Sequence, residues 1–476
     1  MTQNGVCPPA AATYNKLVSP PVVSRARTVA FAALILTYFL YFSWDRLPVH
    51  FSSDDMMNMA YHWSLPPVRL LLAQFAIWQG VHRPMAGLFY TSLFGLFGLN
   101  PVPFHAVIAL FELGVVCLMY RLATLLRCGS AVAVLVAFVA SYHVGLVDLF
   151  YNIAYCYDVL CCFFYLSALT YYIRIRQAGG SPRGHQWGLL AALYVCALNS
   201  KEMAVTLPVI VLAYEWCYHR AQFRLRGPIT SGILIAAALN LVFIYGAVFG
   251  SQGLTHESGY QPVFSLGRIV AFQRTSLADL LFLDRTLGWK AILALWVILF
   301  VLAWKRADPA LRFCWLMMVV TPLPIEFLEG RGRACLYIPL AAWAIFASTL
   351  VVRLVGVVRP PVIRHTLLAV CLLLWADYNR FNKIHYVKPA MADLGRQTWE
   401  VIGQIRALHP RARPHSLVVF LDDPFPAWDM LFIARLWFRD RTVRIELQSK
   451  MPLAAAELAQ ADSVFTFESG RLVQVK

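Results

Sequence analysis

Charged residues are scarce in this sequence. Only 14% of its 476 residues are Asp, Glu, Lys or Arg, whereas 59% are hydrophobic. That balance excludes an ordinary soluble protein, in which about a quarter of the residues are charged. In a soluble chain the net charge of +16 would suggest a nucleic-acid partner. Here Lys and Arg concentrate in alternate loops between apolar stretches, so we expect no nucleic-acid partner.

Motifs for metal or nucleotide binding are also missing. Most of the 11 cysteines lie in apolar stretches, where they act as small hydrophobic residues, and none has the spacing of metal ligands. No Asp-x-Asp motif of a nucleotide-sugar enzyme stands out. The sequence therefore predicts no dedicated metal site, and it leaves a requirement for a divalent cation, Mg or Mn, open.

Apolar stretches that could cross a membrane recur along the chain. A helical crossing needs roughly 20 predominantly apolar residues. We expect about eleven crossings, near residues 28–44, 103–120, 129–147, 153–173, 187–199, 203–218, 229–250, 288–304, 311–327, 335–352 and 365–378. Residues 1–26 are expected to be a disordered cytoplasmic segment, and the first crossing is expected to remain as an uncleaved anchor.

The basic loops assign the two sides of the membrane. With about eleven crossings, the Arg- and Lys-rich loops all fall on the side that the positive-inside rule makes cytoplasmic. The apolar run 85–99 cannot be a full crossing, because it would move Arg121 and Arg127 to the other side. Residues 45–102 are therefore predicted to be an outer loop with helices lying along the membrane surface. Residues 251–287 form a second outer loop.

The fold class predicted from these patterns is an all-α polytopic membrane protein with a small α/β domain at its C-terminus. The membrane domain covers residues 27–380, and the α/β domain covers residues 381–476 on the outer side. Within the latter we expect strands near 415–421, 443–447 and 463–467 and a helix near 452–460. Asp422 and Asp423 are read as part of a turn.

Charges beside or between apolar stretches are the candidate functional residues. Asp54 and Asp55 follow the first crossing, where a carboxylate could deprotonate a hydroxyl or hold a metal ion. The alternative is a helix cap formed by Ser53 or Asp54. Lys201 and Glu202 join two helices too short to cross a core of about 30 Å, so they are expected to line a polar cavity. Their alternative is a structural ion pair.

Four local motifs, taken in order, resemble those of a known enzyme family. They are Asp54-Asp55; His82-Arg83-Pro84 with Gly98-Leu99-Asn100-Pro101 and Phe104-His105; Asn199-Ser200-Lys201-Glu202-Met203-Ala204-Val205-Thr206-Leu207-Pro208; and Leu336-Tyr337-Ile338-Pro339. The chain resembles the GT-C fold membrane glycosyltransferases, which use dolichyl- or polyprenyl-phosphate sugars. Within them it is nearest to the protein O-mannosyltransferase group, including the tetratricopeptide-containing membrane mannosyltransferases. The resemblance covers residues 28 to 345.

The sequence departs from this group in two places. Arg333-Ala334-Cys335 stands where the group usually has Glu-Arg, with Arg331 nearby, so either arginine could take that role. The tetratricopeptide repeats are absent and the α/β domain stands in their place, which weakens the inference of a protein acceptor.

The resemblance implies an inverting glycosyltransferase, hexosyl or pentosyl, that moves a sugar from a polyprenyl-phosphate donor to an acceptor hydroxyl. Asp54 matches the catalytic position of the family and is expected to be the general base. Asp55, about 100° further around a helix, would orient the acceptor or the helix end. The candidates for binding the donor phosphate are Arg83, Lys201, Arg331, Arg333 and Tyr337. The candidates for contacting the sugar or the acceptor are His82, Asp158 and Glu202.

The implied partners are the polyprenyl-phosphate-linked sugar, membrane lipid, and an acceptor protein, glycan or glycolipid. Three alternatives stay open from the residues alone: a lipid-linked glycan polymerase or ligase, a transporter or flippase, and a non-catalytic assembly subunit. A transporter would usually show repeat symmetry between its halves, which this sequence does not clearly have. We expect the bacterial inner membrane, with the site facing the periplasm, or the endoplasmic reticulum membrane in a eukaryote.

Overall fold

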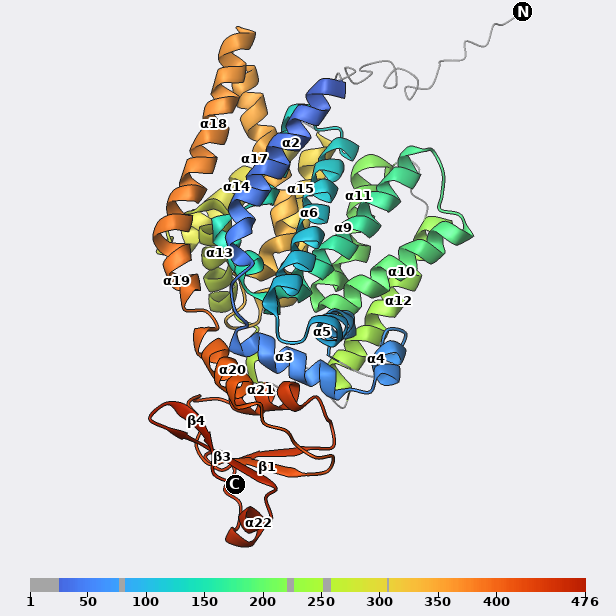
Figure 1. Ribbon diagram of the computed structural model, residues 1–476. Helices are drawn as coiled ribbons and strands as arrows, with labels where there is room; N and C mark the ends of the chain where they lie inside the picture. Colours follow the sequence, from blue (N-terminus) through green and yellow to red (C-terminus); the bar gives the residue numbers. More distant parts are fainter. Residues whose placement is uncertain (1–24, 77–81, 221–226, 251–257, 306–307) are drawn as a thin grey trace, which may run out of the picture.

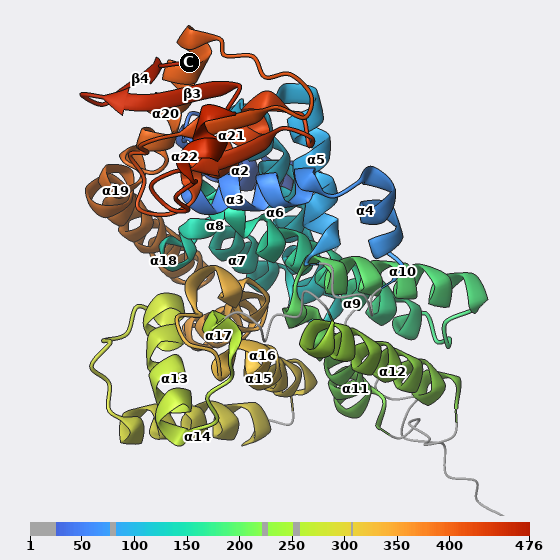
Figure 2. The same ribbon diagram turned by 90° about the horizontal axis from the view of Figure 1, so that it is seen from below.

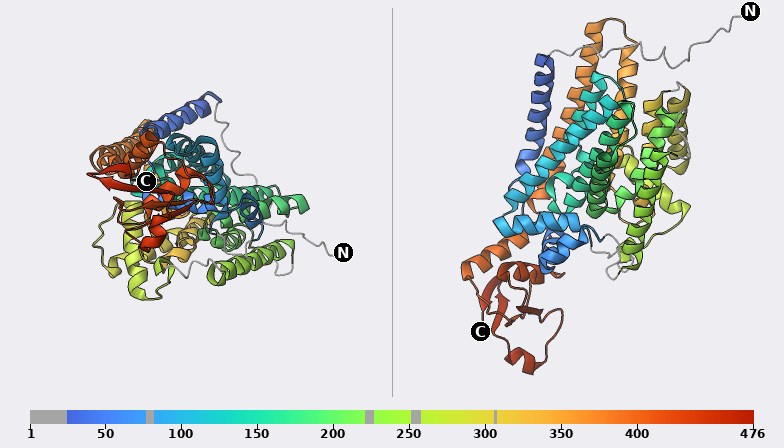
Figure 3. Two further views of the ribbon diagram at one scale, coloured as in Figure 1. Left: turned by 60° about the horizontal axis from the view of Figure 1, so that its bottom comes forward. Right: turned by 90° about the vertical axis from the view of Figure 1, so that its right-hand side faces the viewer.

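The computed structural model describes residues 25–76, 82–220, 227–250, 258–305 and 308–476. The expected disordered segment therefore lies outside the described residues apart from its last two, and so do the first residues of the second outer loop. The long helices run side by side, and a small sheet lies beyond one end of them (Figure 1). We call the end that carries the sheet the outer end. Helix α2 begins at the opposite end (Figures 1 and 3).

Helices form at all the expected crossings. They are α2 (Arg25–Ser43), α6 (Pro101–Leu125), α7 (Ser130–Ser141), α9 (Cys156–Gln177), α10 (Gly184–Ser200), α11 (Leu207–Tyr218), α12 (Pro228–Phe249), α14 (Trp289–Lys305), α15 (Pro309–Val320), α17 (Tyr337–Gly356) and α18 (Pro361–Asn382). Short elements between them are η1 (Trp44–Arg46), η2 (Val144–Leu146), α8 (Asp148–Tyr151), η3 (Ile153–Tyr155), η4 (Glu202–Thr206), η7 (Ser258–Tyr260), α13 (Leu266–Leu281), α16 (Leu323–Glu326), η8 (Arg333–Leu336), η9 (Lys383–Val387) and α19 (Lys388–Ala392).

The long helices make the chain an integral membrane protein. Within the described ranges, five segments are long and apolar enough to cross a membrane: residues 101–125, 153–177, 229–249, 333–356 and 361–408. Helices α7, α11 and α15 have 12 residues each. At a rise of 1.5 Å per residue, such a helix is about 18 Å long and does not span the hydrocarbon core unaided. The number of about eleven crossings therefore stays a prediction.

Proline marks where several helices begin. Pro101, Pro309 and Pro361 stand in the first turn of α6, α15 and α18, where a backbone N–H has no partner inside the helix and its absence costs nothing. In α6 the side chain of Asn100 also accepts a hydrogen bond from the backbone N–H of Val102 at 3.2 Å. Local sequence thus sets these boundaries.

Three helices of the first outer loop lie across the outer end of the bundle. They are α3 (Ser53–Ser64), α4 (Pro67–Ala73) and α5 (Pro84–Phe97). Figure 1 shows α3 lengthwise and α5 nearly end-on, and Figure 2 shows both lengthwise from below, so both lie roughly perpendicular to the long helices. The apolar run 85–99 accordingly forms a helix that lies across the bundle.

The C-terminal region is an α/β unit. It contains α20 (Arg396–Leu408), β1 (Leu417–Phe420), α21 (Asp429–Phe438), β2 (Arg444–Leu447), α22 (Ala455–Ala459), β3 (Ser463–Glu468) and β4 (Arg471–Gln474). The strand order is β2-β1-β3-β4, with β1 parallel to β2 and β3, and β3 antiparallel to β4. The three expected strands and α22 form where predicted. Strand β4 and helices α20 and α21 were not predicted.

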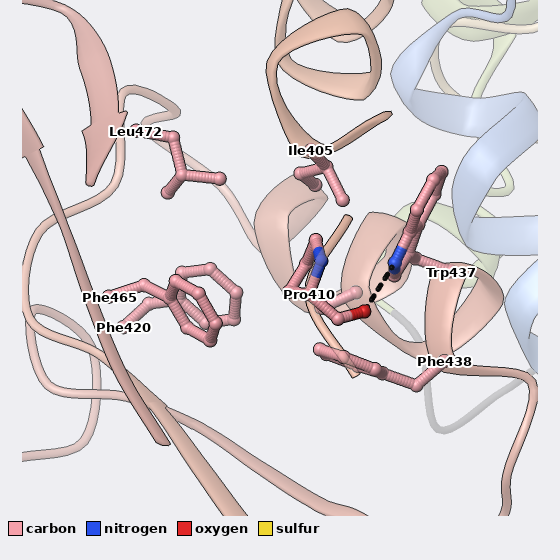
Figure 4. Close-up of a pocket in the computed structure, with 8 residues that line it drawn as sticks. Ile405, Pro410, Phe420, Trp437, Phe438, Phe465 and Leu472 are labelled. Atoms are coloured by element: carbon pink, nitrogen blue, oxygen red, sulfur yellow. Dashed lines mark hydrogen bonds between the residues drawn. The ribbon is translucent and has the colours of Figure 1, made fainter. Parts of the chain in front are cut away.

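The core of this unit lies between its sheet and its helices. The rings of Phe420 and Phe465 stack with their centroids 5.2 Å apart (Figure 4). Across from them, Trp437 Nε1 donates a hydrogen bond to the carbonyl of Pro410 at 3.3 Å. The space between these side chains is apolar and has no room for a water molecule, so it is packed core and not a binding site. The turn after β1 is built by Asp423, which accepts from Phe425 N–H at 2.8 Å.

Candidate active site

The segment between α10 and α11 places two opposite charges in different directions. Helix α10 ends at Ser200, and Lys201 has an extended backbone, with φ −163° and ψ 150°. The short helix η4 then begins at Glu202. Successive side chains of an extended segment point to opposite sides. Lys201 and Glu202 therefore pair with other elements and not with each other, in contrast to the structural pair that the sequence left open.

Lys201 is held by a buried acid in the first turn of α9. Its Nζ donates to both carboxylate oxygens of Asp158 in α9, at 2.6 and 2.7 Å, and the two side chains are 8% and 4% exposed. A third contact, at 3.2 Å, joins Nζ to Sγ of Cys335. The three N–H donors of the ammonium are thus all used within the protein.

Glu202 binds an arginine from the first outer loop. Arg83 Nε and Nη2 donate to the two oxygens of Glu202 at 3.1 and 3.0 Å, which is the two-pronged geometry that a guanidinium favours. Nη2 also donates to the hydroxyl of Tyr260 at 3.1 Å, and the guanidinium lies 4.7 Å from the ring centroid of Tyr157. Arg83 has φ +45°, a left-handed conformation that is unfavourable for a residue with a side chain. Pro84 starts α5 directly after it.

Arg331 completes the cluster without an acid of its own. Its guanidinium lies 4.3 Å from the ring centroid of Tyr260. Arg83 contacts the same ring. The ion pairs of the described residues include Arg83, Lys201 and Arg333 but not Arg331. Its Nε is buried and has no hydrogen-bond partner among those residues. Arg331 is therefore the cation of this cluster that is available to an anion.

Arg333 lies in a second, more exposed cluster. It contacts Asp148 at 3.4 Å, and its side chain is 55% exposed. Asp279 of α13, 3% exposed, pairs nearby with Arg285 at 2.8 Å. Burial raises the pKa of Asp279, an effect that Arg285 and Arg333 oppose. Of the two arginines, Arg331 contacts the ring of Tyr260 and Arg333 pairs with Asp148. Which of them binds the donor phosphate stays a prediction.

Two histidines border the first cluster as neutral groups. His62 of α3 is buried, with Nε2 3.4 Å from the hydroxyl of Tyr157, and the ring of His82 lies 6.0 Å from the Tyr157 ring. Burial lowers the pKa of both histidines to about 3, and the nearby charge of Arg83 acts in the same direction. Both imidazoles are therefore uncharged at neutral pH and can donate or accept a hydrogen bond.

The acidic pair at the start of α3 divides into two different environments. Asp54 is exposed, whereas Asp55 is fully buried. Asp55 Oδ2 accepts from Ser52 N at 2.7 Å, and Ser52 Oγ accepts from Asp55 N at 3.3 Å, which closes a capping box. The alternative of a cap at Ser53 or Asp54 is therefore wrong in its position, because α3 begins at Ser53 and Ser52 is its cap.

The hydroxyl of Tyr337 makes no hydrogen bond to either cluster. Tyr337 starts α17 and is 1% exposed, and its hydroxyl has no hydrogen-bond partner among the described residues. Its contact with the donor phosphate stays a prediction. No group of three or more His, Cys, Asp or Glu side chains that could hold a metal ion occurs in the described ranges. The divalent cation that the sequence left open thus has no candidate ligand set there.

A large apolar cavity opens beside the segment that carries Glu202. Its volume is about 540 Å³, and its lining comes from α9, α10, α11 and α12. Leu207 and Pro208, which directly follow η4, belong to that lining, and Tyr194 and Leu239 lie further along it. A cavity of this size and composition can hold part of a hydrocarbon chain.

Three residues with buried or clustered charge contacts, Tyr260 in the first cluster and the separate pair of Arg46 and Glu112, had weak or no sequence signals. Tyr260 stands in an outer loop with nothing to mark it, although it contacts both Arg83 and Arg331. Arg46 and Glu112 form a fully buried ion pair at 2.5 Å. Glu112 could have been noticed as an acid in the middle of an expected crossing, where such a residue is costly unless paired.

Comparisons with known proteins leave the family of this chain unassigned. No protein-family model matches the sequence. No curated protein matches it either. Among solved structures, the crystal structure of ArnT from Cupriavidus metallidurans bound to undecaprenyl phosphate matches with a TM-score of 0.49 and 13% identity, over 94% of each chain. A similarity of this size does not assign an activity.

Proposed function

We propose that this protein is a membrane glycosyltransferase that moves a sugar from a polyprenyl-phosphate donor to an acceptor hydroxyl at the outer end of the bundle. The observation that carries the proposal is the charged cluster of Arg83, Glu202 and Arg331 beside an apolar cavity. A lipid-linked sugar phosphate has the same two parts, an anionic head and a hydrocarbon tail. The motif resemblance described above points to the same donor class.

The phosphate would bind at Arg331, supported by Arg83. Arg331 has no acidic partner in the described ion pairs, whereas Glu202 holds Arg83 in a fixed orientation. Negative charge builds on the phosphate oxygen as its bond to the sugar breaks, and fixed guanidinium groups stabilise that charge. Lys201 is fully engaged by Asp158 and Cys335 and would hold the hairpin in place behind this site.

The tail of the donor would occupy the apolar cavity. Polyprenyl chains are hydrocarbon, and burying apolar surface contributes about 25 cal/mol per Å². Because Leu207 and Pro208 of the lining follow the Glu202 segment directly, a lipid seated there would carry its phosphate toward the charged cluster.

Asp54 would be the general base. It is exposed on the first turn of α3 at the outer end, where its carboxylate can accept a proton from an acceptor hydroxyl. In a single displacement, the acceptor oxygen bonds to the anomeric carbon, the bond from that carbon to the phosphate oxygen breaks, and the proton passes to Asp54. The configuration of the sugar is inverted. His82, which is uncharged, and Glu202 would contact the sugar.

Mannose is the sugar suggested by the resemblance, and a protein, glycan or glycolipid hydroxyl is the acceptor class. In a bacterium the outer end would face the periplasm, and in a eukaryote it would face the lumen of the endoplasmic reticulum.

Release of labelled sugar from polyprenyl-phosphate mannose tests the proposal. The purified protein in lipid should release or transfer the sugar. Asp54→Asn should lower kcat by 10²-fold or more, the scale of general-base catalysis, with donor binding retained. Arg331→Ala should weaken donor binding by about tenfold or more. Asp377→Asn and Arg380→Ala are matched controls, since these exposed residues pair with each other at the end of α18.

Two results would contradict the proposal. Full activity in Asp54→Asn would remove the base from its assigned role. If the wild-type protein bound no polyprenyl-phosphate sugar in a panel that includes mannose, other hexoses and pentoses, the donor class would be wrong, and a transporter or a polymerase of lipid-linked glycans would become the better reading.

A further inference from the structure

The C-terminal α/β unit packs against α3, the helix that carries Asp54. Helix α21 packs against α3 at the outer end of the bundle (Figures 1 and 2). Further contacts from the unit lie at or beside the two ends of α3. Nothing in the sequence connects residues so far apart.

An arginine from the α/β unit caps the C-terminal end of α3 by donating hydrogen bonds to its carbonyls. The last carbonyls of a helix have no partner within it. Arg441 Nε donates to the carbonyl of Trp63 at 2.9 Å, and Nη2 donates to the carbonyl of Leu65 at 3.0 Å. The guanidinium also lies 5.4 Å from the Trp63 ring centroid. One side chain thus satisfies two carbonyls and covers the ring beside them.

Two further contacts hold the chain just before α3. The rings of His50 and Trp399 stack with centroids 4.5 Å apart and planes 5° from parallel. Gly395, with φ +69°, lies so close to this segment that an added Cβ would come within 2.3 Å of the carbonyl oxygen of Phe51. Only glycine allows this approach and this backbone conformation.

Helix α3 needs such support because it is short. It has 12 residues, a length at which an isolated helix is marginal in water. Its first turn presents Asp54, and His62 near its other end faces Tyr157 beside the charged cluster. A displacement of α3 would therefore move the carboxylate relative to the site. Misplacement of a reacting group by about 1 Å can lower a rate by about 10²-fold.

We propose that the C-terminal unit positions α3 for the transfer reaction and that Arg441 is the positioning residue at its C-terminal end. This inference rests on the proposed function, since it assigns the position of Asp54 a role in catalysis. Arg441 itself touches no reacting group. The residues assigned to the donor, Arg83, Glu202 and Arg331, lie outside the elements that Arg441 contacts.

The test combines hydrogen exchange with kinetics on the full-length protein in lipid. Arg441→Ala should speed amide exchange across residues 53–65 by about tenfold or more and leave exchange in α9 unchanged. It should lower kcat for sugar release about ten- to a hundredfold, while KM for polyprenyl-phosphate mannose stays within about twofold. Arg441→Lys keeps the positive charge and one donor nitrogen but loses the second nitrogen that reaches the other carbonyl, and it should fall between Arg441→Ala and wild type.

The matched control is Arg444→Ala. Arg444 lies on β2 in the same unit, is 57% exposed and pairs with Glu446 of its own strand at 2.8 Å. This variant should match wild type in both measurements. Unchanged exchange in α3 of Arg441→Ala would overturn the inference whether or not the protein is a transferase. Faster exchange in α3 of Arg441→Ala with an unchanged kcat would show that Arg441 stabilises α3 without affecting the reaction, and this result would also overturn the inference. A wild type without activity would instead contradict the proposed function.

Discussion

Separating Lys201 from Asp158 should show how a charged pair survives inside this bundle. The ammonium lies 2.6 and 2.7 Å from the two carboxylate oxygens, and both side chains are buried. At an effective dielectric constant of about 20, unit charges about 3 Å apart attract by about 5.5 kcal/mol. Taking the two ions out of water costs several kcal/mol for each. The intact pair therefore contributes little net stability.

Breaking the pair on one side has a different cost. Lys201→Met or Asp158→Leu leaves the other charge buried and uncompensated, which destabilises a protein by about 3–5 kcal/mol. The double variant buries two apolar side chains in place of two ions, so it should lie within about 1 kcal/mol of wild type. The two single losses sum to about 6–10 kcal/mol, so a strong coupling between the positions is expected.

Thermal unfolding of the purified protein in detergent measures these differences. An unfolding entropy of about 2.1 cal/mol/K per residue gives about 1 kcal/mol/K for a chain of 476 residues. Each single variant should then unfold about 3–5 °C below wild type, and the double variant within about 1 °C of it. If the double variant instead lost the sum of the single effects, the two charges would be independent and the pairing argument would be refuted.

Two further predictions concern buried charges outside the proposed reaction. Burial raises the pKa of Asp55 from 3.8 to about 7. The folded state therefore favours the protonated carboxyl, and the stability that this contributes is fully present below about pH 4. It is lost as the pH rises to about 7, a change of about 4 kcal/mol in the free energy of unfolding. Asp55→Asn, which keeps an oxygen for the Ser52 N–H, should flatten this slope in melts taken between pH 4 and 8. Glu112→Gln should leave the buried charge of Arg46, now 2.5 Å from a carboxylate oxygen, without a counter-charge and lower the free energy of unfolding by about 3–5 kcal/mol. The double variant Arg46→Met with Glu112→Leu should recover most of that loss in the same melts. A flat pH profile in wild type, or additive losses at the second pair, would contradict these expectations.

The elements of this fold were largely readable from the sequence. Hydrophobic stretches located the long helices, and proline and asparagine at the start of α6 set its boundary, because these signals act over a few residues. The short strands β1, β2 and β3 were predicted for the same reason. Strand β4, Arg471–Gln474, was not predicted, because it is specified by its antiparallel pairing with β3.

The candidate site was readable only as a set of residue types. Arg83, Lys201, Glu202 and Asp158 could be singled out, because charges are rare and expensive in an apolar chain. Their partners could not be derived. The sequence suggested a pair within Lys201-Glu202, whereas the extended backbone at Lys201 sends the two side chains to Asp158 and Arg83.

What the sequence determined by itself is therefore local: which stretches are apolar, where helices begin, and which positions carry charge. Only the tertiary structure decided which charges meet, that Tyr260 contacts both Arg83 and Arg331, and that Arg441 reaches the end of α3. Each of these contacts joins residues far apart in the chain. Their formation depends on the packing of whole elements, and no short-range pattern encodes that distance or direction.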